Sequence, residues 1–398
     1  MRSSCQVEVS LDRFTPGAST VQRLRLESSL MIDPVEFQRR GLYDPDSPNA
    51  EDRLALLRWL EDHGVSLDEM VEAEARSRLT DLLGGRLIRP AERFHLTELA
   101  TRAGIPVERV KKIRRAVGFA APESGVGVYT DGDVETLRVF EAAAAFFGDR
   151  AALEFTRTLG SALARVAEAA LSLFLSNVEA PLMTERPSEL ELAKANLEAT
   201  KLLNMVPNLM DSLFRVHIEE AIRRSQDARR VTRSYDTAWL AVGFVDLVGF
   251  TPLSQRLSVR ELAAVVNEFE ARAFDVASDN TGRVVKLIGD EVMFVAPTAD
   301  AGCQIALTIA ESCARNGSVR PRGGVAIGDL LTRSGDYYGP IVNLASRIAE
   351  LAIPHEILVT AQVRTDAQNA GSLIFEPAGR RMLKGFDEPV ELFAVTRA

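Results

Sequence analysis

The hydrophobic pattern of this chain changes its period near residue 236, and this change constrains the fold more than any other feature. From Pro48 to about Tyr235, apolar residues recur at helical spacing in segments rich in Ala and Leu. Beyond that point, strand-like runs such as AWLAVGFVDLVGF alternate with amphipathic segments such as SVRELAAVVNEFEARAFDVASDN. The pattern predicts an all-α first part followed by an α+β second part.

These changes also predict the domain boundaries. Residues 1–30 show no sustained periodicity and are expected to be a loose N-terminal extension. Residues 31–210 would form a helical domain, residues 211–235 a linker helix, and residues 236–398 the α+β domain. Within the helical stretch that begins at Glu189, Pro207 should kink or break the helix, because proline cannot donate the backbone hydrogen bond.

Composition limits the environment and the partners of the chain. Its 398 residues carry 47 basic and 56 acidic side chains, a net charge of −9, which argues against a general affinity for nucleic acid or anionic membranes. Cys5, Cys303 and Cys313 have neither metal-ligand nor disulfide-framework spacing, and the latter two are expected in a core. We expect no membrane span and a cytoplasmic location, because we identify no apolar run of membrane-spanning length.

One carboxylate, Asp246, interrupts the apolar strand-like run GFVDLVGFT at residues 243–251. A buried carboxylate normally binds a proton or finds a cation. In KLIGDEVMFV, Asp290 lies at a glycine-assisted turn between two further strands, where the simplest interpretation is an ordinary turn residue. If the strands are neighbours, Asp246 and Asp290 would repel one another unless a divalent cation lies between them and a phosphate chain.

A third stretch, GDYYGPIVNLASRIAELA at residues 335–352, carries Asn343 and Arg347 four residues apart. On a helix this spacing places both side chains on one face. An amide and a guanidinium suit a ribose and a phosphoryl oxygen. Taken alone, however, a polar helix face is the simpler interpretation.

Taken together, these stretches resemble the catalytic domains of class III nucleotide cyclases. FVDLVGFT, VKLIGDEVMFV, GDYYGPIVNLASR and LKGFDEPVELFAV look like the four signatures of that family, in the same order, across roughly residues 236–398. All six functional positions of the family are filled. The resemblance implies a ferredoxin-like palm, a head-to-tail homodimer with sites at the subunit interface, and conversion of a nucleoside triphosphate to a 3′,5′-cyclic monophosphate and pyrophosphate.

The same resemblance implies roles for four of the six positions. Asp246 and Asp290 would bind two Mg²⁺ or Mn²⁺ ions, which activate the ribose 3′-hydroxyl and neutralise the leaving pyrophosphate. Asn343 would orient the ribose. Arg347 would stabilise charge that grows on the α-phosphoryl oxygens in the transition state.

The remaining two positions, Lys286 and Asp336, would read the base. Adenine presents an acceptor at N1 and a donor at its 6-amino group, which match a lysine donor and a carboxylate acceptor. Guanine reverses both polarities and would leave two groups mismatched. The pair therefore predicts ATP as the substrate.

The segment FHLTELATRAGIPVERVKKIRRAVGF at residues 94–119 reads like a helix-turn-helix with a basic second helix, and the segment YTDGDVETLRVF after it resembles the next helix of MerR-type DNA-binding regulators. DNA binding is one interpretation, which the acidic surroundings disfavour. The arrangement also resembles the helical regulatory domain of actinobacterial adenylyl cyclases, including the pH-responsive, autoinhibited type. We therefore predict a regulatory role, with His217 as a candidate titrating group.

Three alternatives compete with a regulated adenylyl cyclase. A sensor or scaffold with a degenerate cyclase fold would not need six intact positions. A diguanylate cyclase has a GGDEF turn that resembles IGDEV, but the VNLASR and LKG stretches favour a nucleotide cyclase. A DNA-binding regulator would bind random DNA with a strong salt dependence.

Overall fold

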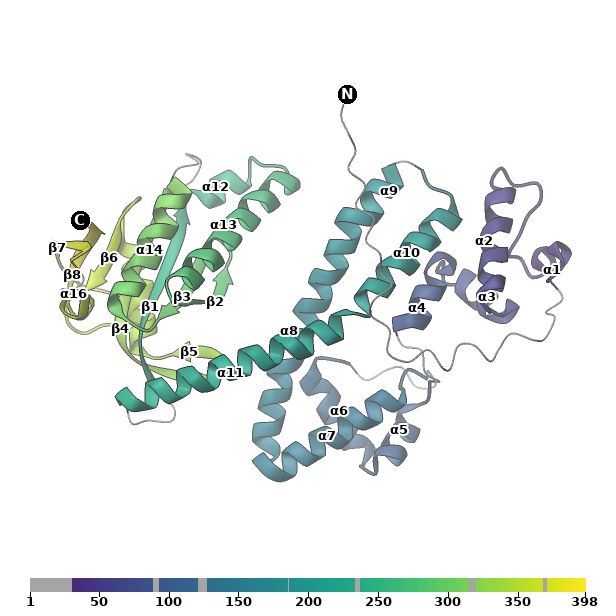
Figure 1. Ribbon diagram of the computed structural model, residues 1–398, viewed down its shortest axis with the longest axis horizontal. Helices are drawn as coiled ribbons and strands as arrows, with labels where there is room; N and C mark the ends of the chain where they lie inside the picture. The colour runs from purple at the N-terminus through teal and green to yellow at the C-terminus, as the bar shows by residue number, and fades with distance from the viewer. Residues whose placement is uncertain are drawn as a thin grey trace. The chain divides into compact units, whose positions relative to one another are not determined.

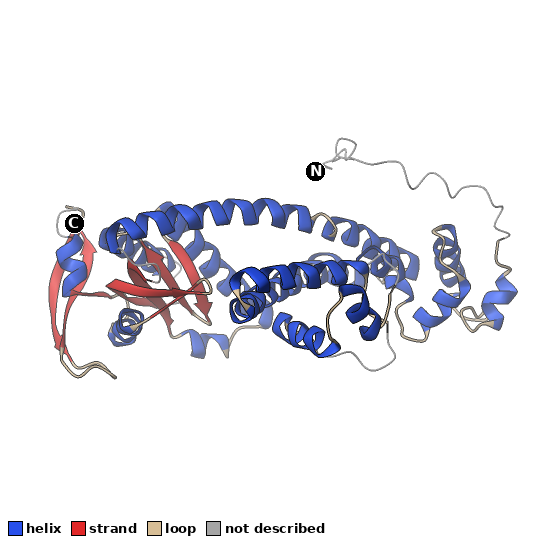
Figure 2. Ribbon diagram, turned by 90° about the horizontal axis from the view of Figure 1, so that it is seen from below, coloured by secondary structure: helices blue, strands red, loops and turns tan. Residues whose placement is uncertain are grey.

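The computed structural model describes residues 31–88, 93–120, 127–184, 186–232, 237–314, 320–367 and 371–398. Two compact units divide the chain, one ending at Leu209 and the other beginning at Met210. The first unit is helical, and the named strands all lie in the second (Figures 1 and 2). The prediction for residues 1–30, with Cys5, concerns residues outside those described.

The first helical bundle forms around a core that includes Phe37, Leu56 and Leu60, all fully buried. Its helices are α1 (Pro34–Arg39), α2 (Ala50–Asp62), α3 (Leu67–Glu74), the short η1 (Leu79–Asp81), α4 (Leu82–Ile88) and α10 (Glu189–Leu203). The last of these returns from far along the chain, and its Ala193 and Leu197 complete the core.

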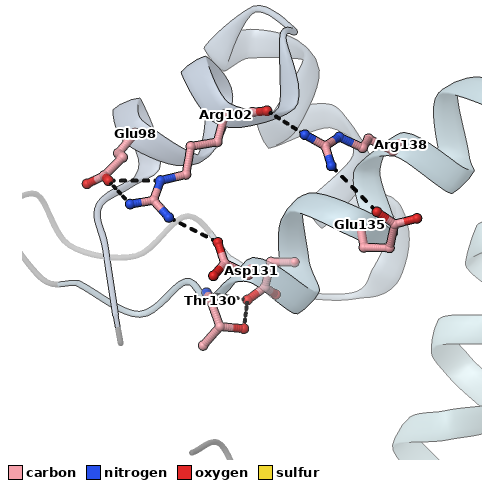
Figure 3. A network of polar contacts seen from close by, with 7 residues as sticks. Glu98, Arg102, Thr130, Asp131, Glu135 and Arg138 are labelled. Atoms are coloured by element: carbon pink, nitrogen blue, oxygen red, sulfur yellow. Dashed lines mark hydrogen bonds and ion pairs between the residues drawn. The ribbon is translucent and has the colours of Figure 1, made fainter. Parts of the chain in front are cut away.

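A second bundle contains the predicted helix-turn-helix. It comprises α5 (Leu96–Ala103), α6 (Val107–Val117), α7 (Asp131–Phe147) and α8 (Asp149–Phe174). Gly104 forms the turn between α5 and α6 with φ 72°, a conformation that favours glycine. Figure 3 shows how α5 is tied to α7: Arg102 binds Glu98 and Asp131, and Arg138 donates to the carbonyl of Arg102 at 3.2 Å.

The basic second helix of this motif packs within the bundle. Lys112 binds Asp149 at 2.9 Å, and Arg109 binds both Glu141 and Asp149. A side chain at Gly160 of α8 would collide with the backbone of Val117, so α6 and α8 approach closely. The α8 helix and its neighbour α7 thus neutralise two of the basic residues that a DNA-binding helix would present to phosphates.

Helix α8 carries an exposed apolar surface. Helix α8, η2 (Leu175–Glu179) and α9 (Ala180–Thr184) form one continuous helix, Asp149–Thr184, which is long and apolar enough to cross a membrane by length and composition alone. Phe155, Leu159 and Leu173 are among its exposed side chains. We expected no apolar run of membrane-spanning length from the sequence, and that expectation did not take this helix into account. Only 6% of its most apolar 18-residue window is buried inside the protein, so length and composition are the evidence for a span.

The break predicted at Pro207 is present, displaced by a few residues. Helix α10 ends at Leu203, and α11 (Val206–Thr232) begins immediately before the proline. Pro207 therefore lies in the first turn of α11, where its missing N–H costs nothing.

The C-terminal unit is built on one mixed sheet. Its strands are β1 (Thr237–Val248), β2 (Arg283–Ile288), β3 (Glu291–Ala296), β4 (Arg320–Arg333), β5 (Asp336–Tyr338), β6 (Ile357–Thr360), β7 (Leu373–Arg381) and β8 (Val390–Arg397). The order is β2-β3-β1-β4-β6-β8-β7, with β5 paired to β4 beside this path. Strands β4 and β6 are parallel, and the other pairs are antiparallel.

Helices cover both faces of this sheet. They are α12 (Phe250–Ser254), α13 (Val259–Asp279), α14 (Ala299–Ala314), α15 (Pro340–Leu351) and α16 (Ala361–Ala367). Figure 1 shows α13 and α14 beside the strands of this sheet. The larger core lies between the sheet and α13, α14 and α16, and it contains Cys303 with Cys313 packed against it. Helix α15 covers the other face, where Ala345 and Ala349 contact the side of β1 that carries Val242 and Phe244. This is the predicted α+β palm.

Candidate active site

Asp246 lies near the end of the central strand β1, on the sheet face that α15 covers. Side chains alternate along a strand, so Asp246 shares this face with Val242 and Phe244. It is paired in register with Glu291 on β3 and Arg322 on β4. The Oδ2 atom of Asp246 accepts from Arg322 Nε at 3.0 Å and from Arg322 Nη2 at 2.9 Å. The carboxylate that looked unpaired in the sequence therefore meets an arginine of its own chain.

Asp290 lies in the turn between β2 and β3, and this turn approaches β1. Gly289 precedes it with φ 64°, which gives the tight turn that the sequence predicted. The backbone N–H of Leu247 donates to the carbonyl of Asp290 at 3.2 Å, which brings the turn beside Asp246. The two predicted metal ligands are therefore neighbours.

Acidic side chains crowd this part of the sheet. Burial raises the pKa of Asp290, and the nearby Asp246 raises it further. Burial, together with the charges of Asp246, Glu350 and Asp290, raises the pKa of Glu291 to about 7. The folded protein thus favours the neutral form of Glu291, which gains its charge as the pH rises through about 7.

This crowding fits divalent cations. Among the described residues, no group of three or more His, Cys, Asp or Glu side chains forms a ready metal cage. Mg²⁺ commonly binds through one or two carboxylates and completes its shell with substrate phosphates and water. Asp246 and Asp290 supply such a pair, and a cation between them would relieve the repulsion that raises the pKa of Asp290.

Lys286 on β2 and Asp336 on β5, the predicted base-reading residues, form an ion pair. Lys286 Nζ lies 2.6 Å from Asp336 Oδ2, although 50 residues separate them. A bulge in β2 just before Lys286 disturbs the register of the strand, and such bulges re-aim side chains. Burial alone would raise the pKa of Asp336, but hydrogen bonds from Lys286 and from the backbone N–H of Tyr337 bring it below its usual range. Asp336 is therefore held as a charged acceptor.

Asn343 and Arg347 lie one turn apart on α15, as the spacing predicted. Pro340 opens this helix, and its buried side presents Ala345 and Ile348 to the sheet. Asn343 is exposed, whereas Arg347 is partly buried and binds both carboxylate oxygens of Glu350, at 2.5 and 2.7 Å. The structure thus brings the two aspartates together and the base-reading pair together, while Arg347 contacts neither pair.

Two neighbours of the site, Glu291 and Arg322, were missed by sequence reasoning. Glu291 stands beside Asp290 in the quoted motif, but nothing in the motif says that its side chain meets Asp246. Arg322 lies 76 residues from Asp246. Only the strand register, which pairs Asp246 with both residues, could have revealed them.

Comparison with known proteins defines the family to which this fold belongs. Residues 39–222 match the adenylate cyclase regulatory domain, and residues 232–396 match the adenylate and guanylate cyclase catalytic domain. The crystal structure of the adenylyl cyclase CyaB from P. aeruginosa is 23% identical, covers 41% of this chain and 95% of that one, and gives a TM-score of 0.38.

Relatives match across both units. An uncharacterized protein of Mycobacterium tuberculosis is 32% identical, over 91% of this chain and 95% of its own length. An adenylate cyclase of Streptomyces coelicolor is 31% identical, over 79% of this chain and 83% of its own. A pH-sensitive adenylate cyclase of M. tuberculosis is 30% identical, over 87% and 88% respectively. The chain belongs to the adenylate cyclases that carry this regulatory domain before the catalytic domain, and it is an adenylate cyclase.

Proposed function

We propose that this cyclase converts ATP to 3′,5′-cyclic AMP and pyrophosphate with two divalent metal ions, at sites formed between two copies of the chain. The observation that carries this proposal is the ion pair between Lys286 and Asp336, whose donor and acceptor match adenine. The adjacent aspartates Asp246 and Asp290 complement it with a place for the triphosphate and its metals.

The proposed site residues have separate roles in the reaction. Asp246 and Asp290 would hold Mg²⁺ or Mn²⁺, which would supply positive charge to activate the ribose 3′-hydroxyl and to neutralise the leaving pyrophosphate. Asn343 orients the ribose, so that the 3′-oxygen faces the α-phosphorus. Arg347 leaves Glu350 and donates to the α-phosphoryl oxygens as their charge grows.

A direct assay tests this substrate assignment. Purified protein is incubated with Mn²⁺ and either ATP or GTP, and the products are separated by chromatography. Cyclic AMP from ATP is expected, with little cyclic GMP from GTP. Equal turnover of both nucleotides would contradict the adenine assignment without contradicting the cyclase chemistry.

The dimer explains why Arg347 contacts neither predicted pair within its own chain. In a head-to-tail homodimer, the aspartates of one chain would face Asn343 and Arg347 of the other. The exposed position of Asn343 and the partial exposure of Arg347 suit such an interface.

Mixing two inactive variants tests this arrangement. Asp246→Ala and Arg347→Ala proteins should each be nearly inactive alone and regain activity when mixed, because the mixed dimer contains one intact site out of two. The measurement is cyclic AMP formation against mixing ratio, with dimerisation followed by analytical ultracentrifugation. Confirmed mixed dimers without activity would show that each site is built within one chain.

We further propose that the helical unit restrains the catalytic unit through α11, the helix that leads toward β1. A complete switch would require about 10⁴-fold differential binding, so control of roughly a few- to a hundred-fold is expected. His217 is exposed on α11 and is a candidate for a pH trigger.

Truncation measures this control. The full chain and a protein that begins at Arg233 should differ in activity and in pH profile between about pH 5.5 and 8. Burial and the neighbouring carboxylates raise the pKa of Glu291 in the catalytic unit to about 7, so the truncated protein provides the reference profile and only the difference between the two profiles reports regulation. Identical activities and profiles at equal dimerisation would exclude the helical unit as a regulator.

A further inference from the structure

Arg322 contacts two parts of the catalytic unit that serve different steps. Its Nε and Nη2 atoms donate to Asp246 on β1, at 3.0 and 2.9 Å. Its Nη1 atom donates to the carbonyl of Glu350 at 2.8 Å and approaches the carbonyl of Ala352 at 3.4 Å. These carbonyls lie at the C-terminal end of α15, the helix that carries Arg347.

This arrangement suits the chemistry of a helix end. The last carbonyls of a helix lack intrahelical partners, and a cation near them interacts favourably with the helix dipole. Arg322 satisfies carbonyls at this end of α15 with one edge of its guanidinium while another edge binds a carboxylate. The planar group has five donors in a fixed geometry, so one side chain can meet both demands, whereas a lysine ammonium cannot reproduce the fork.

Close packing makes this connection short and stiff. A Cβ atom added at Gly324, two residues beyond Arg322, would lie 2.4 Å from the backbone nitrogen of Ala349. The backbone of β4 therefore touches that of α15 almost directly. The guanidinium is also largely enclosed, with the Arg322 side chain 27% exposed and Asp246 21% exposed. A shift of α15 along the sheet would have to break or drag these hydrogen bonds.

We propose that Arg322 is a positioning residue that fixes Asp246 and the C-terminal end of α15 to one another. The inference rests on the proposed head-to-tail dimer. There, Asp246 belongs to one active site and Arg347 of the same chain to the other. Arg322 thus ties the metal half of one site to the phosphoryl half of the second, and binding at one site is transmitted to the other through each chain.

Direct metal binding tests the first half of the proposal. Mn²⁺ binding is measured by electron paramagnetic resonance with an ATP analogue that lacks the 3′-hydroxyl, so no turnover occurs. Arg322→Gln and Arg322→Lys should each weaken Mn²⁺ binding by about 10- to 100-fold, the usual effect of removing a group that orients a metal ligand. Arg320→Gln, at an exposed arginine on the same strand, should leave binding unchanged.

The sign of this effect separates two roles. If Arg322 merely competed with the metal for Asp246, Arg322→Gln would tighten Mn²⁺ binding and Arg322→Lys would resemble the wild type. Either result overturns the proposal. Asp246→Ala serves as the reference: if it leaves Mn²⁺ binding intact, the metal assignment itself fails, whereas loss in Asp246→Ala with normal binding in both Arg322 variants refutes only the role of Arg322. Thermal unfolding midpoints establish that the compared proteins are folded.

Mixed dimers test the second half. The reference mixture combines Asp246→Ala with Arg347→Ala and leaves one intact site. Adding Arg322→Gln to the Arg347→Ala chain changes only the chain that supplies the metal carboxylates of the intact site, and the Mn²⁺ requirement should rise. Adding Arg322→Gln to the Asp246→Ala chain changes only the chain that supplies α15 to the intact site, and kcat at saturating Mn²⁺ should fall. A mixture of the second kind that matches the reference would refute the connection to α15.

Discussion

Asp246→Ala and Asp290→Ala should each lower cyclic AMP formation by about three orders of magnitude or more. Metal ions stabilise the charge of a phosphoryl-transfer transition state by several kcal/mol, and about 1.4 kcal/mol corresponds to a factor of ten in rate. Each variant removes one of two neighbouring carboxylates, Asp246 on β1 and Asp290 in the turn that approaches β1. Initial rates at saturating Mn²⁺ and ATP measure the effect.

A matched variant separates this loss from a general disturbance of the unit. Asp366 is an exposed aspartate on α16 that binds Gln362 of the same helix, so Asp366→Ala should retain full activity. All three variants should unfold cooperatively, and Asp246→Ala should unfold at a lower temperature than the other two, because it leaves the partly buried guanidinium of Arg322 without its carboxylate partner. Activity close to wild type in either site variant would contradict the metal assignment.

The strands that carry the site could be predicted because each has a local signal in the sequence. In β1 an apolar run surrounds Asp246, and in the β2–β3 hairpin Gly289 and Asp290 mark the turn. Two other strands have no such local signal. The strand β5 is only three residues long, and β7 is an edge strand, mostly exposed, with a bulge between Pro377 and Gly379. Neither has the alternating apolar pattern that identifies a strand in sequence.

The surroundings of the site were harder to predict than its members. The cost of burying a charge was enough to single out Asp246, and helical spacing was enough to place Asn343 and Arg347 together. The partner of Asp246 depends on the pairing of β1 with β4, and a shift by one residue would have turned Arg322 to the other face. Register is set by packing across the whole sheet, so no local motif contains it.

Replacing both base-reading residues, Lys286 and Asp336, should change which nucleotide the enzyme accepts. A site that hydrogen-bonds its substrate rejects a mismatched analogue by factors of roughly 10⁴ to 10⁵, because buried polar groups are left unpaired. In the wild type, the Asp336 carboxylate lies 2.6 Å from the ammonium of Lys286. Lys286→Glu alone would place a second carboxylate opposite Asp336, and the repulsion between the two would disturb the site. The double variant Lys286→Glu with Asp336→Cys avoids this repulsion and removes both groups that match adenine.

In that double variant, kcat/KM for ATP should fall by about 100-fold or more, and the ratio of GTP to ATP turnover should rise, since a glutamate can accept from the guanine N1–H. The exposed pair of Glu311 and Arg397, 2.9 Å apart in the same unit, provides the control, because its double alanine variant should keep the ATP preference. Asp246→Ala protein, purified and assayed in the same way, measures any activity from contaminating cyclases. A folded, active Lys286–Asp336 variant with an unaltered nucleotide preference would show that other groups read the base.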